Sequence, residues 1–287
     1  MRSRVHDDTL RATRNATLCE LVVWRERIRL GYNAPMECTV KGIVRYDGTN
    51  FVGWQVQPNQ PTVQGKIEKA LATIAQQPIR VLGSGRTDAG VHALAQVFSF
   101  KWPAESPPDS LRRSLTKMLG PEISIEEIEQ APDDFHPIYA AKSKYYTYVF
   151  STKSEADPFI SRYAWSPIWP MDRARFGELA QRVVGEHDFA GFCSSGSSVE
   201  DTVRTIHSVK VADGGVIQPC DRADLWQVTF HGNGFLYKMV RNIVGTLADV
   251  TRGHVPEEEL EKRLTAPAPF KGFTAPAHGL FLARVCY

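Results

Sequence analysis

The chain has 287 residues, of which 43% are hydrophobic and 23% charged, and its formal net charge is +2. This composition is typical of an ordinary globular protein, long enough for one large domain or two average ones. No run of about eighteen apolar residues is present, so we expect no membrane span. Because the net charge is so small, a surface for a nucleic acid would have to come from local clustering of Lys and Arg.

The five cysteines are scattered, odd in number and form no Cys-x-x-Cys pair; they are Cys19, Cys38, Cys193, Cys220 and Cys286. This pattern argues against a disulfide framework and against a cysteine zinc site. It suits a reducing compartment, so we expect a cytoplasmic protein without a metal.

Residues 1–35 hold seven arginines against four acidic residues, a net charge of +3. They show no helical or strand period that persists, and they lack the compact apolar stretch of a secretory signal. We predict a disordered N-terminal extension, with Met36 as the true start. A short amphipathic helix near residues 18–30 is the alternative.

From Glu37 onward the apolar residues become periodic. Alternation over residues 38–46 predicts a half-buried strand, and helical spacing after Thr62 predicts a helix to about Ile74. A short strand at residues 79–81 leads into a glycine-rich loop. A returning strand over 91–102 and a helix over 111–119 complete this half.

Residues 131–134 precede a change of period, and we place a domain boundary there, between domains 36–134 and 135–287. Both halves then show strand, helix, strand and helix, which predicts an α+β fold with helices on one face of mainly antiparallel sheets. The elements expected in the second half are a strand at 146–150, a helix at 171–184, a Ser/Gly-rich loop at 192–199, strands at 206–211 and 225–230, and a helix from Phe235 to Leu247.

The glycine-rich loop at residues 83–92 places Asp88 beside Arg86 and among glycines that let a ligand approach the main chain. A carboxylate in such a turn could be offered to a substrate as a nucleophile or as a general base. The loop lacks the Gly-Lys-Ser/Thr end of a P-loop and the third glycine of a dinucleotide loop. The alternative interpretation is a tight turn in which Asp88 hydrogen-bonds its own backbone.

The order Gly85-Arg86-Thr87-Asp88-Ala89-Gly90-Val91-His92-Ala93 resembles the signature of the TruA family of tRNA pseudouridine synthases. The resemblance extends to further motifs in the family's order, at residues 46–55, 62–65, 144–148, 235–245 and 279–282. It therefore covers the chain from about residue 37 to the C-terminus.

The resemblance implies two domains whose sheets join around a central RNA-binding cleft, and a homodimer. It implies that uridine is isomerised to pseudouridine in the anticodon stem-loop of tRNA, at the positions conventionally numbered 38 to 40. That reaction breaks the N1–C1′ bond, turns the base and joins C5 to C1′. It needs no metal, nucleotide or other cofactor.

The resemblance also assigns roles to single residues. Asp88 matches the catalytic aspartate, and whether it acts as nucleophile or base stays open. Arg86 is expected to fill the space left by an extruded nucleotide, and it could also pair with Asp88 or clamp a phosphate. Tyr146 matches the active-site tyrosine, with Tyr145 as the alternative if the register is off by one. Arg241 is expected to support Asp88 or to bind phosphate.

His92 follows the loop closely, and we predict a structural hydrogen-bonding role for it rather than acid–base catalysis. Two other functions stay open for the chain. A noncatalytic tRNA-binding or RNA-chaperone module of this fold would have no need of Asp88 beside an anionic ligand. A cofactor-free hydrolase would normally want a second carboxylate, which no nearby motif offers.

Overall fold

The computed structural model describes residues 37–105, 107–155, 157–196, 199–216, 222–265, 268 and 270–287. The predictions for residues 1–35 and for Met36 lie outside the described residues. So does part of the Ser/Gly-rich loop, since residues 197 and 198 are not described.

The strands of the described residues form one nine-stranded sheet, in the order β4-β1-β3-β9-β5-β8-β7-β6, with β2 paired to β3. Every pairing is antiparallel except that of β3 with β9. The sheet is therefore mainly antiparallel, as predicted. The strands are β1 Cys38–Tyr46, β2 Val81–Gly83, β3 His92–Trp102, β4 Ile123–Ala131, β5 Ser143–Ser151, β6 Gly185–Asp188, β7 Val203–Asp213, β8 Leu225–Gly232 and β9 Leu280–Cys286.

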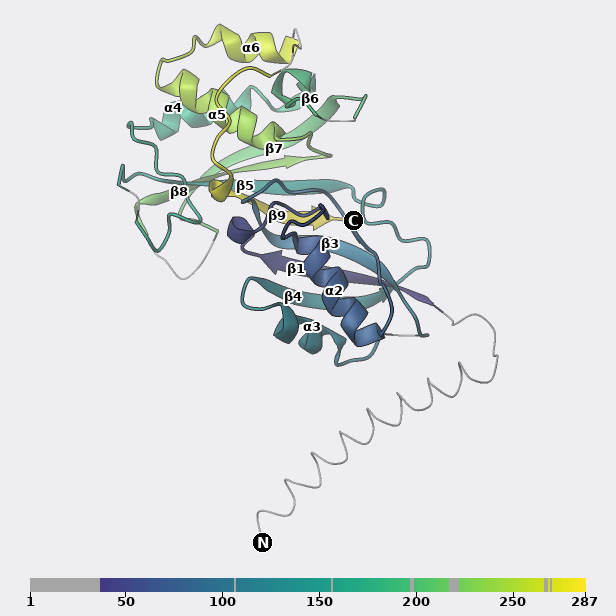
Figure 1. The fold of residues 1–287 in the computed structure, drawn as a ribbon. Helices are drawn as coiled ribbons and strands as arrows, with labels where there is room; N and C mark the ends of the chain where they lie inside the picture. The colour runs from purple at the N-terminus through teal and green to yellow at the C-terminus, as the bar shows by residue number, and fades with distance from the viewer. Residues whose placement is uncertain are drawn as a thin grey trace, which may run out of the picture.

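The helices lie on one side of this sheet (Figure 1). Helices α2 and α3 cover the N-terminal half, while α4, α5 and α6 cover the C-terminal half. The main core is packed between these two layers, as the helical and alternating apolar patterns predict. The helices are η1 Gly48–Asn50, α2 Val63–Ala75, α3 Leu111–Leu119, α4 Arg173–Gln181, η2 Phe189–Phe192, α5 Met239–Thr251, α6 Glu258–Thr265 and η3 Ala277–Gly279.

Two helices begin later than their apolar patterns predict. Helix α5 starts at Met239 rather than at Phe235, because Lys238 adopts a left-handed backbone conformation with φ of 59°. Helix α4 starts at Arg173, where the side chain of Asp172 caps it by accepting a bond from the Arg175 amide. Strands β4 and β6 and helix α6 were not predicted.

Strand β9, close to the C-terminus, lies at the middle of the sheet and joins its two halves. It pairs with β3 only through His92 with Phe281 and Ala93 with Leu282, whereas it pairs with β5 along most of its length. The boundary predicted at residues 131–134 falls between β4 and β5. The sheet itself continues across that point, and the division into two domains stays a prediction.

Candidate active site

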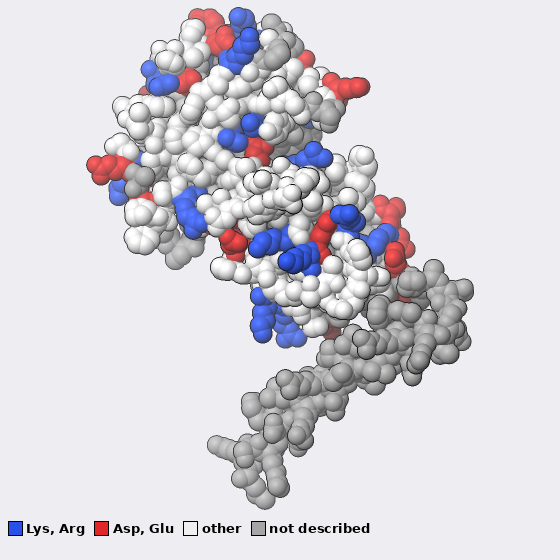
Figure 2. All heavy atoms as spheres, viewed as in Figure 1, with Lys and Arg blue, Asp and Glu red and all other residues white. Residues whose placement is uncertain are grey.

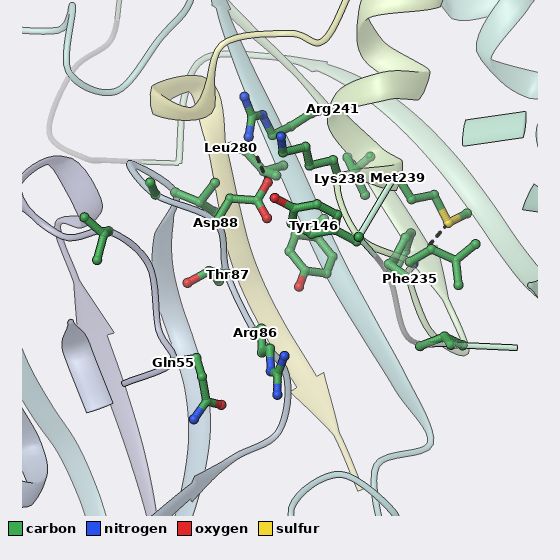
Figure 3. A pocket seen from close by; sticks show the side chains of 18 of the residues that line it. Gln55, Arg86, Thr87, Asp88, Tyr146, Phe235, Lys238, Met239, Arg241 and Leu280 are labelled. Carbon is green, nitrogen blue, oxygen red and sulfur yellow. Dashed lines mark hydrogen bonds and ion pairs between the residues drawn. The ribbon is translucent and has the colours of Figure 1, made fainter. Parts of the chain in front are cut away.

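A pocket of about 830 Å³ lies where the loop before β3 faces the segment that leads into α5. Residues from both halves of the chain line it, and strand β5 contributes to its wall. All four predicted site residues belong to this lining: Arg86, Asp88, Tyr146 and Arg241 (Figure 3). The fold thus brings Asp88 and Arg241 into one pocket although they are 153 residues apart in the sequence.

Asp88 begins a tight turn, but its carboxylate does not close that turn. The backbone carbonyl of Asp88 accepts the Val91 amide at 3.2 Å, and Gly90 takes the positive φ of 76° that the turn requires. The side chain is thereby left to face the pocket (Figure 3). The alternative in which the Asp88 carboxylate serves only its own backbone is wrong.

Thr87, the residue before Asp88, is held in place by residues of the N-terminal half of the chain. The Tyr46 and Thr87 hydroxyls are 2.8 Å apart and buried, and the Trp54 amide donates to the Thr87 carbonyl at 3.1 Å. Gly53 allows this approach, because a Cβ there would lie 2.5 Å from the Thr87 oxygen. The position of Asp88 therefore depends on the core beneath the loop.

The carboxylate of Asp88 forms an ion pair with Arg241 across the pocket. Arg241 Nη1 is 2.8 Å from Asp88 Oδ2, and the two side chains are only 14% and 17% exposed. Arg241 Nε also donates to the carbonyl of Ala275 at 2.8 Å, and the Ala275 amide returns a bond to the Arg241 carbonyl. The guanidinium is thus oriented by a second contact, which fixes the carboxylate it meets.

That close approach of the 273–275 segment to α5 depends on Gly245. A Cβ on Gly245 would lie 1.9 Å from the carbonyl oxygen of Phe273. Asn242, which follows Arg241 in the helix, is fully buried. It also holds this segment, since its side-chain oxygen accepts a hydrogen bond from the Thr274 hydroxyl. The motif at residues 235–245 therefore combines residues that line the pocket, Arg241 among them, with others that pack the helix.

Arg86 does not form the expected ion pair with Asp88. In the part of the chain that the structure describes, the salt bridge of Asp88 is with Arg241, and Arg86 is an exposed residue of the pocket lining. Its side chain extends away from the carboxylate (Figure 3). Only Thr87 lies between Arg86 and Asp88 in the chain, yet the two side chains diverge, and the Asp88 carboxylate meets Arg241 instead.

The register of strand β5 is the predicted one. Tyr146 faces the pocket, only 8% exposed, with its ring edge-on to Phe235 at 5.0 Å between centroids. Burial, and to a lesser extent the charge of Asp88, raises the pKa of the Tyr146 phenol. Tyr145 lies on the other face of the sheet, stacked on His231 with centroids 4.0 Å apart.

His92 has the structural role that the sequence predicted. It is 1% exposed, its Nδ1 accepts the Gly48 amide at 3.0 Å, and its Nε2 is 2.8 Å from the carbonyl of Arg162. Burial lowers the pKa of His92, although the nearby Asp47 carboxylate acts in the opposite direction. A neutral ring that accepts at Nδ1 and donates at Nε2 satisfies both contacts.

The sequence motif at residues 235–245 was expected to be helical throughout, so the residues just before α5 were not predicted to line the pocket. Phe235 and Lys238 line the pocket beside Tyr146, and the left-handed conformation of Lys238 turns the chain into the helix there. A positive φ at a lysine has no signal in a single sequence, so the turn of the backbone at Lys238 could not have been predicted.

The described residues contain neither a metal-binding cluster nor a helix that could span a membrane. Within the described part of the chain, no three His, Cys, Asp or Glu side chains lie together in a group that could hold a metal ion. None of the helices in that part has both the length and the apolar character that crossing a bilayer requires.

Comparison with known proteins bears directly on this site. The sequence model of the tRNA pseudouridine synthase family matches residues 43–140 and 179–287, which include the loop of Asp88 and the helix of Arg241. The chain belongs to this family. Pseudouridine synthases are isomerases, and the matched residues include Asp88 and Arg241 of the pocket.

Two curated relatives show how far the family likeness extends. The tRNA pseudouridine synthase A of Brevibacillus brevis is 44% identical over 246 residues, which are 85% of this chain and 98% of the relative. That of Bacillus licheniformis is 40% identical over 255 residues, 88% of this chain and 98% of the relative. The resemblance seen in the loop motif thus holds over nearly the whole length of these pseudouridine synthases.

Proposed function

We propose that this pseudouridine synthase isomerises uridines in the anticodon stem-loop of tRNA, at positions 38 to 40, with Asp88 as the essential carboxylate. The observation that carries the proposal is the Asp88–Arg241 ion pair, 2.8 Å long, in a pocket large enough for a nucleotide. A buried ion pair of this kind offers a carboxylate with a fixed direction and leaves one oxygen for the substrate.

In this proposal Asp88 acts on the target nucleoside while Arg241 holds it in place. The N1–C1′ bond breaks, the detached uracil turns within the pocket, and C5 joins C1′. The proton lost from C5 is balanced by the proton gained at N1, so that product and substrate are isomers. The arrangement serves Asp88 equally well as a nucleophile and as a base.

Arg86 and Tyr146 have complementary roles in the proposal. Arg86 is exposed at the pocket and has no salt bridge with Asp88 in the described residues, so its guanidinium is available to the space left by an extruded nucleotide. Extrusion costs a few kcal/mol of unstacking, which a replacing cation can offset. The buried ring of Tyr146 offers a face on which uracil can stack.

The charge distribution supports a large polyanionic substrate. Lys and Arg side chains gather over α2 and α3 and again in the middle of the molecule, on the face seen in Figure 2. A second hollow of about 470 Å³ between these helices is lined in part by Lys66 and Lys69. Clusters of this kind bind phosphates although the net charge of the chain is only +2.

We also propose a cytoplasmic homodimer, as the family resemblance implies. Light scattering on the purified full chain tests the dimer, which has twice the 32.1 kDa mass of one chain. A mass of one chain at working concentration would contradict it.

The decisive experiment uses unmodified tRNA transcripts that carry uridine at positions 38, 39 or 40. We expect the purified full chain to convert these uridines to pseudouridine, detected by chemical mapping, and to do so after EDTA treatment. Binding without conversion would favour the noncatalytic RNA-binding alternative. Conversion at other positions would leave the reaction in place and overturn the proposed specificity.

A further inference from the structure

The catalytic loop is held at its start by a lysine from the other half of the molecule. Lys144, on strand β5, donates from Nζ to the backbone carbonyl of Ser84 at 2.7 Å. Ser84 lies two residues before Arg86 and four before Asp88. Lys144 itself lies two residues before Tyr146 on the same strand, so the side chains of both point to the same face of β5.

A second contact holds the same short segment from the N-terminal half. The side chain of Gln96 on β3 donates to the carbonyl of Gly85 at 2.7 Å and accepts a bond from the Ser84 hydroxyl at 2.6 Å. Gln96 and Ser84 are both fully buried. The two successive carbonyls at Ser84 and Gly85 are thus bound by one side chain from each half of the sheet.

We propose that Lys144 is a positioning residue for pseudouridine formation: it fixes the start of the Arg86–Asp88 loop relative to the strand that carries Tyr146. The inference rests on the proposed function. Lys144 does not touch the substrate in this account, and it acts through the backbone that places Arg86 and Asp88.

The environment of Lys144 agrees with an internal role. Burial, and secondarily the positive charge of Arg204, lowers the pKa of Lys144 to about 8. A lysine that serves mainly to attract RNA would keep its ammonium in solvent, where the charge acts over a long range. The bond to a carbonyl oxygen instead directs this ammonium toward the loop.

Gly85 is the residue that leaves room for this contact. A Cβ on Gly85 would lie 3.1 Å from Lys144 Nζ, close enough to force the ammonium or the loop to move. The backbone of Gly85 does not have a positive φ, so an alanine would be strained only by this neighbour. Gly85 and Lys144 should therefore be energetically coupled.

The first test separates positioning from RNA attraction in Lys144→Met, with Lys142→Met as the control. Lys142 is exposed and two residues earlier, so its removal takes away the same charge in the same region. We expect Lys144→Met to lower the single-turnover rate at saturating enzyme by about 10- to 100-fold, because small misplacements of reacting groups are this costly. The dissociation constant for tRNA should stay within about threefold, and Lys142→Met should keep the wild-type rate.

The opposite result would assign Lys144 to a phosphate contact. In that case the rate at saturation is retained, binding weakens, and the slope of affinity against salt becomes shallower by about one unit. A loss of stability with an unchanged rate at saturation would show a merely structural residue. Both outcomes overturn the proposal.

The second test measures coupling between Gly85→Ala and Lys144→Met. Methionine ends one atom short of the lysine nitrogen, so the alanine Cβ no longer meets it. In the wild-type protein, we expect Gly85→Ala to lower the urea midpoint of unfolding and the single-turnover rate. In the Lys144→Met variant, the same substitution should lower both much less. Purely additive effects would overturn the proposed contact.

The two tests distinguish failure of this inference from failure of the proposed function. If the wild-type chain makes no pseudouridine, the function fails, while coupling in the unfolding midpoints still tests the contact. If Lys144→Met does not fold, Gly85→Ala alone keeps every charge and should still lower the rate at an unchanged dissociation constant. An unchanged rate in that variant contradicts the inference.

Discussion

At the scale of the residue, the ion pair between Asp88 and Arg241 determines what the pocket can do. Arg241 is held by the Ala275 carbonyl at 2.8 Å as well as by Asp88, so its guanidinium has little freedom to follow a displaced carboxylate. The carboxylate consequently has a fixed direction before any substrate arrives. Preorganisation of this kind is where much of an enzyme's rate enhancement comes from.

We expect Asp88→Asn to abolish pseudouridine formation while tRNA binding persists. The amide is nearly isosteric, but it has no negative charge with which to act as nucleophile or base. The rate should fall by several powers of ten, each equivalent to about 1.4 kcal/mol of barrier. Single-turnover kinetics beside a binding titration at fixed salt measure both quantities.

The matched control for that substitution is Asp134→Asn, at an exposed site in the loop between β4 and β5. It makes the same chemical change away from the pocket and should leave the rate unchanged. If Asp88→Asn keeps more than about a tenth of the wild-type rate, a loss of less than 1.4 kcal/mol, Asp88 is not the central group.

The two adjacent tyrosines of β5 provide an internal comparison. We expect Tyr146→Phe to reduce turnover more than tRNA binding, because the ring remains and only the hydroxyl beside Asp88 is lost. Tyr145→Phe should be mild, since that ring stacks on His231 on the opposite face of the sheet. Single-turnover rates for both variants decide the ranking, and the reverse order would exclude Tyr146 from the site.

At the scale of the element, helix α5 is placed by the chain segment that crosses it. The segment at residues 273–275 lies against Gly245 and bonds Arg241 and Asn242, so helix and segment position the guanidinium together. Tyr148 extends the same arrangement from β5, because its hydroxyl donates to the Pro276 carbonyl at 2.8 Å. The active-site arginine thus depends on contacts that never reach the substrate.

We predict that Gly245→Ala destabilises the protein although alanine is the better helix former. The new Cβ would lie 1.9 Å from the Phe273 oxygen, and overpacking of this kind costs about 1–3 kcal/mol or more. The control is Gly177→Ala in α4, where the new Cβ makes only an ordinary contact of 3.5 Å with Val211. That variant should gain roughly 0.5–1 kcal/mol from backbone entropy.

Urea unfolding of both variants measures the difference in the free energy of unfolding. Gly245→Ala should also lower the single-turnover rate, because any shift of the 273–275 segment moves the carbonyl that orients Arg241. Equal stabilisation by the two alanines would show that the crossing segment yields without cost.

At the scale of the whole molecule, the pocket exists because the C-terminal strand β9 joins the two halves of one sheet. Asp88 comes from the first half, whereas Tyr146 and Arg241 come from the second, and neither half has a complete site. The parallel pairing of β9 with β3 is limited to two residue pairs, so side-chain contacts such as the 2.7 Å bond of Lys144 to Ser84 supplement it.

We predict that a protein starting at Met36 retains the reaction. The family match begins at residue 43, and the described site residues all lie beyond it. At saturating tRNA and low salt the truncated chain should react at a rate comparable with the full chain. Its affinity could be lower and less salt-dependent, because seven arginines are removed. A folded, soluble and inactive truncation would place residues 1–35 in the site.

The sequence by itself determined the elements whose apolar period is strong and the loop whose residue order is specific. Strand β1 and helix α2 follow from alternation and helical spacing, which act between near neighbours in the chain. The register of Tyr146 followed from the family motif at residues 144–148 and not from periodicity. The cysteine pattern and the order of the motifs along the chain were also read from the sequence without any knowledge of which residues meet in space.

Only the tertiary structure decided which charge Asp88 meets. Local spacing favoured Arg86, two positions away in the chain. The fold instead places Arg241, 153 residues away, 2.8 Å from the Asp88 carboxylate. The late start of α5 at a left-handed Lys238 and the reach of Lys144 to Ser84 are of the same kind. Such contacts depend on how the packed sheet aligns distant segments, and periodicity along one segment carries no information about them.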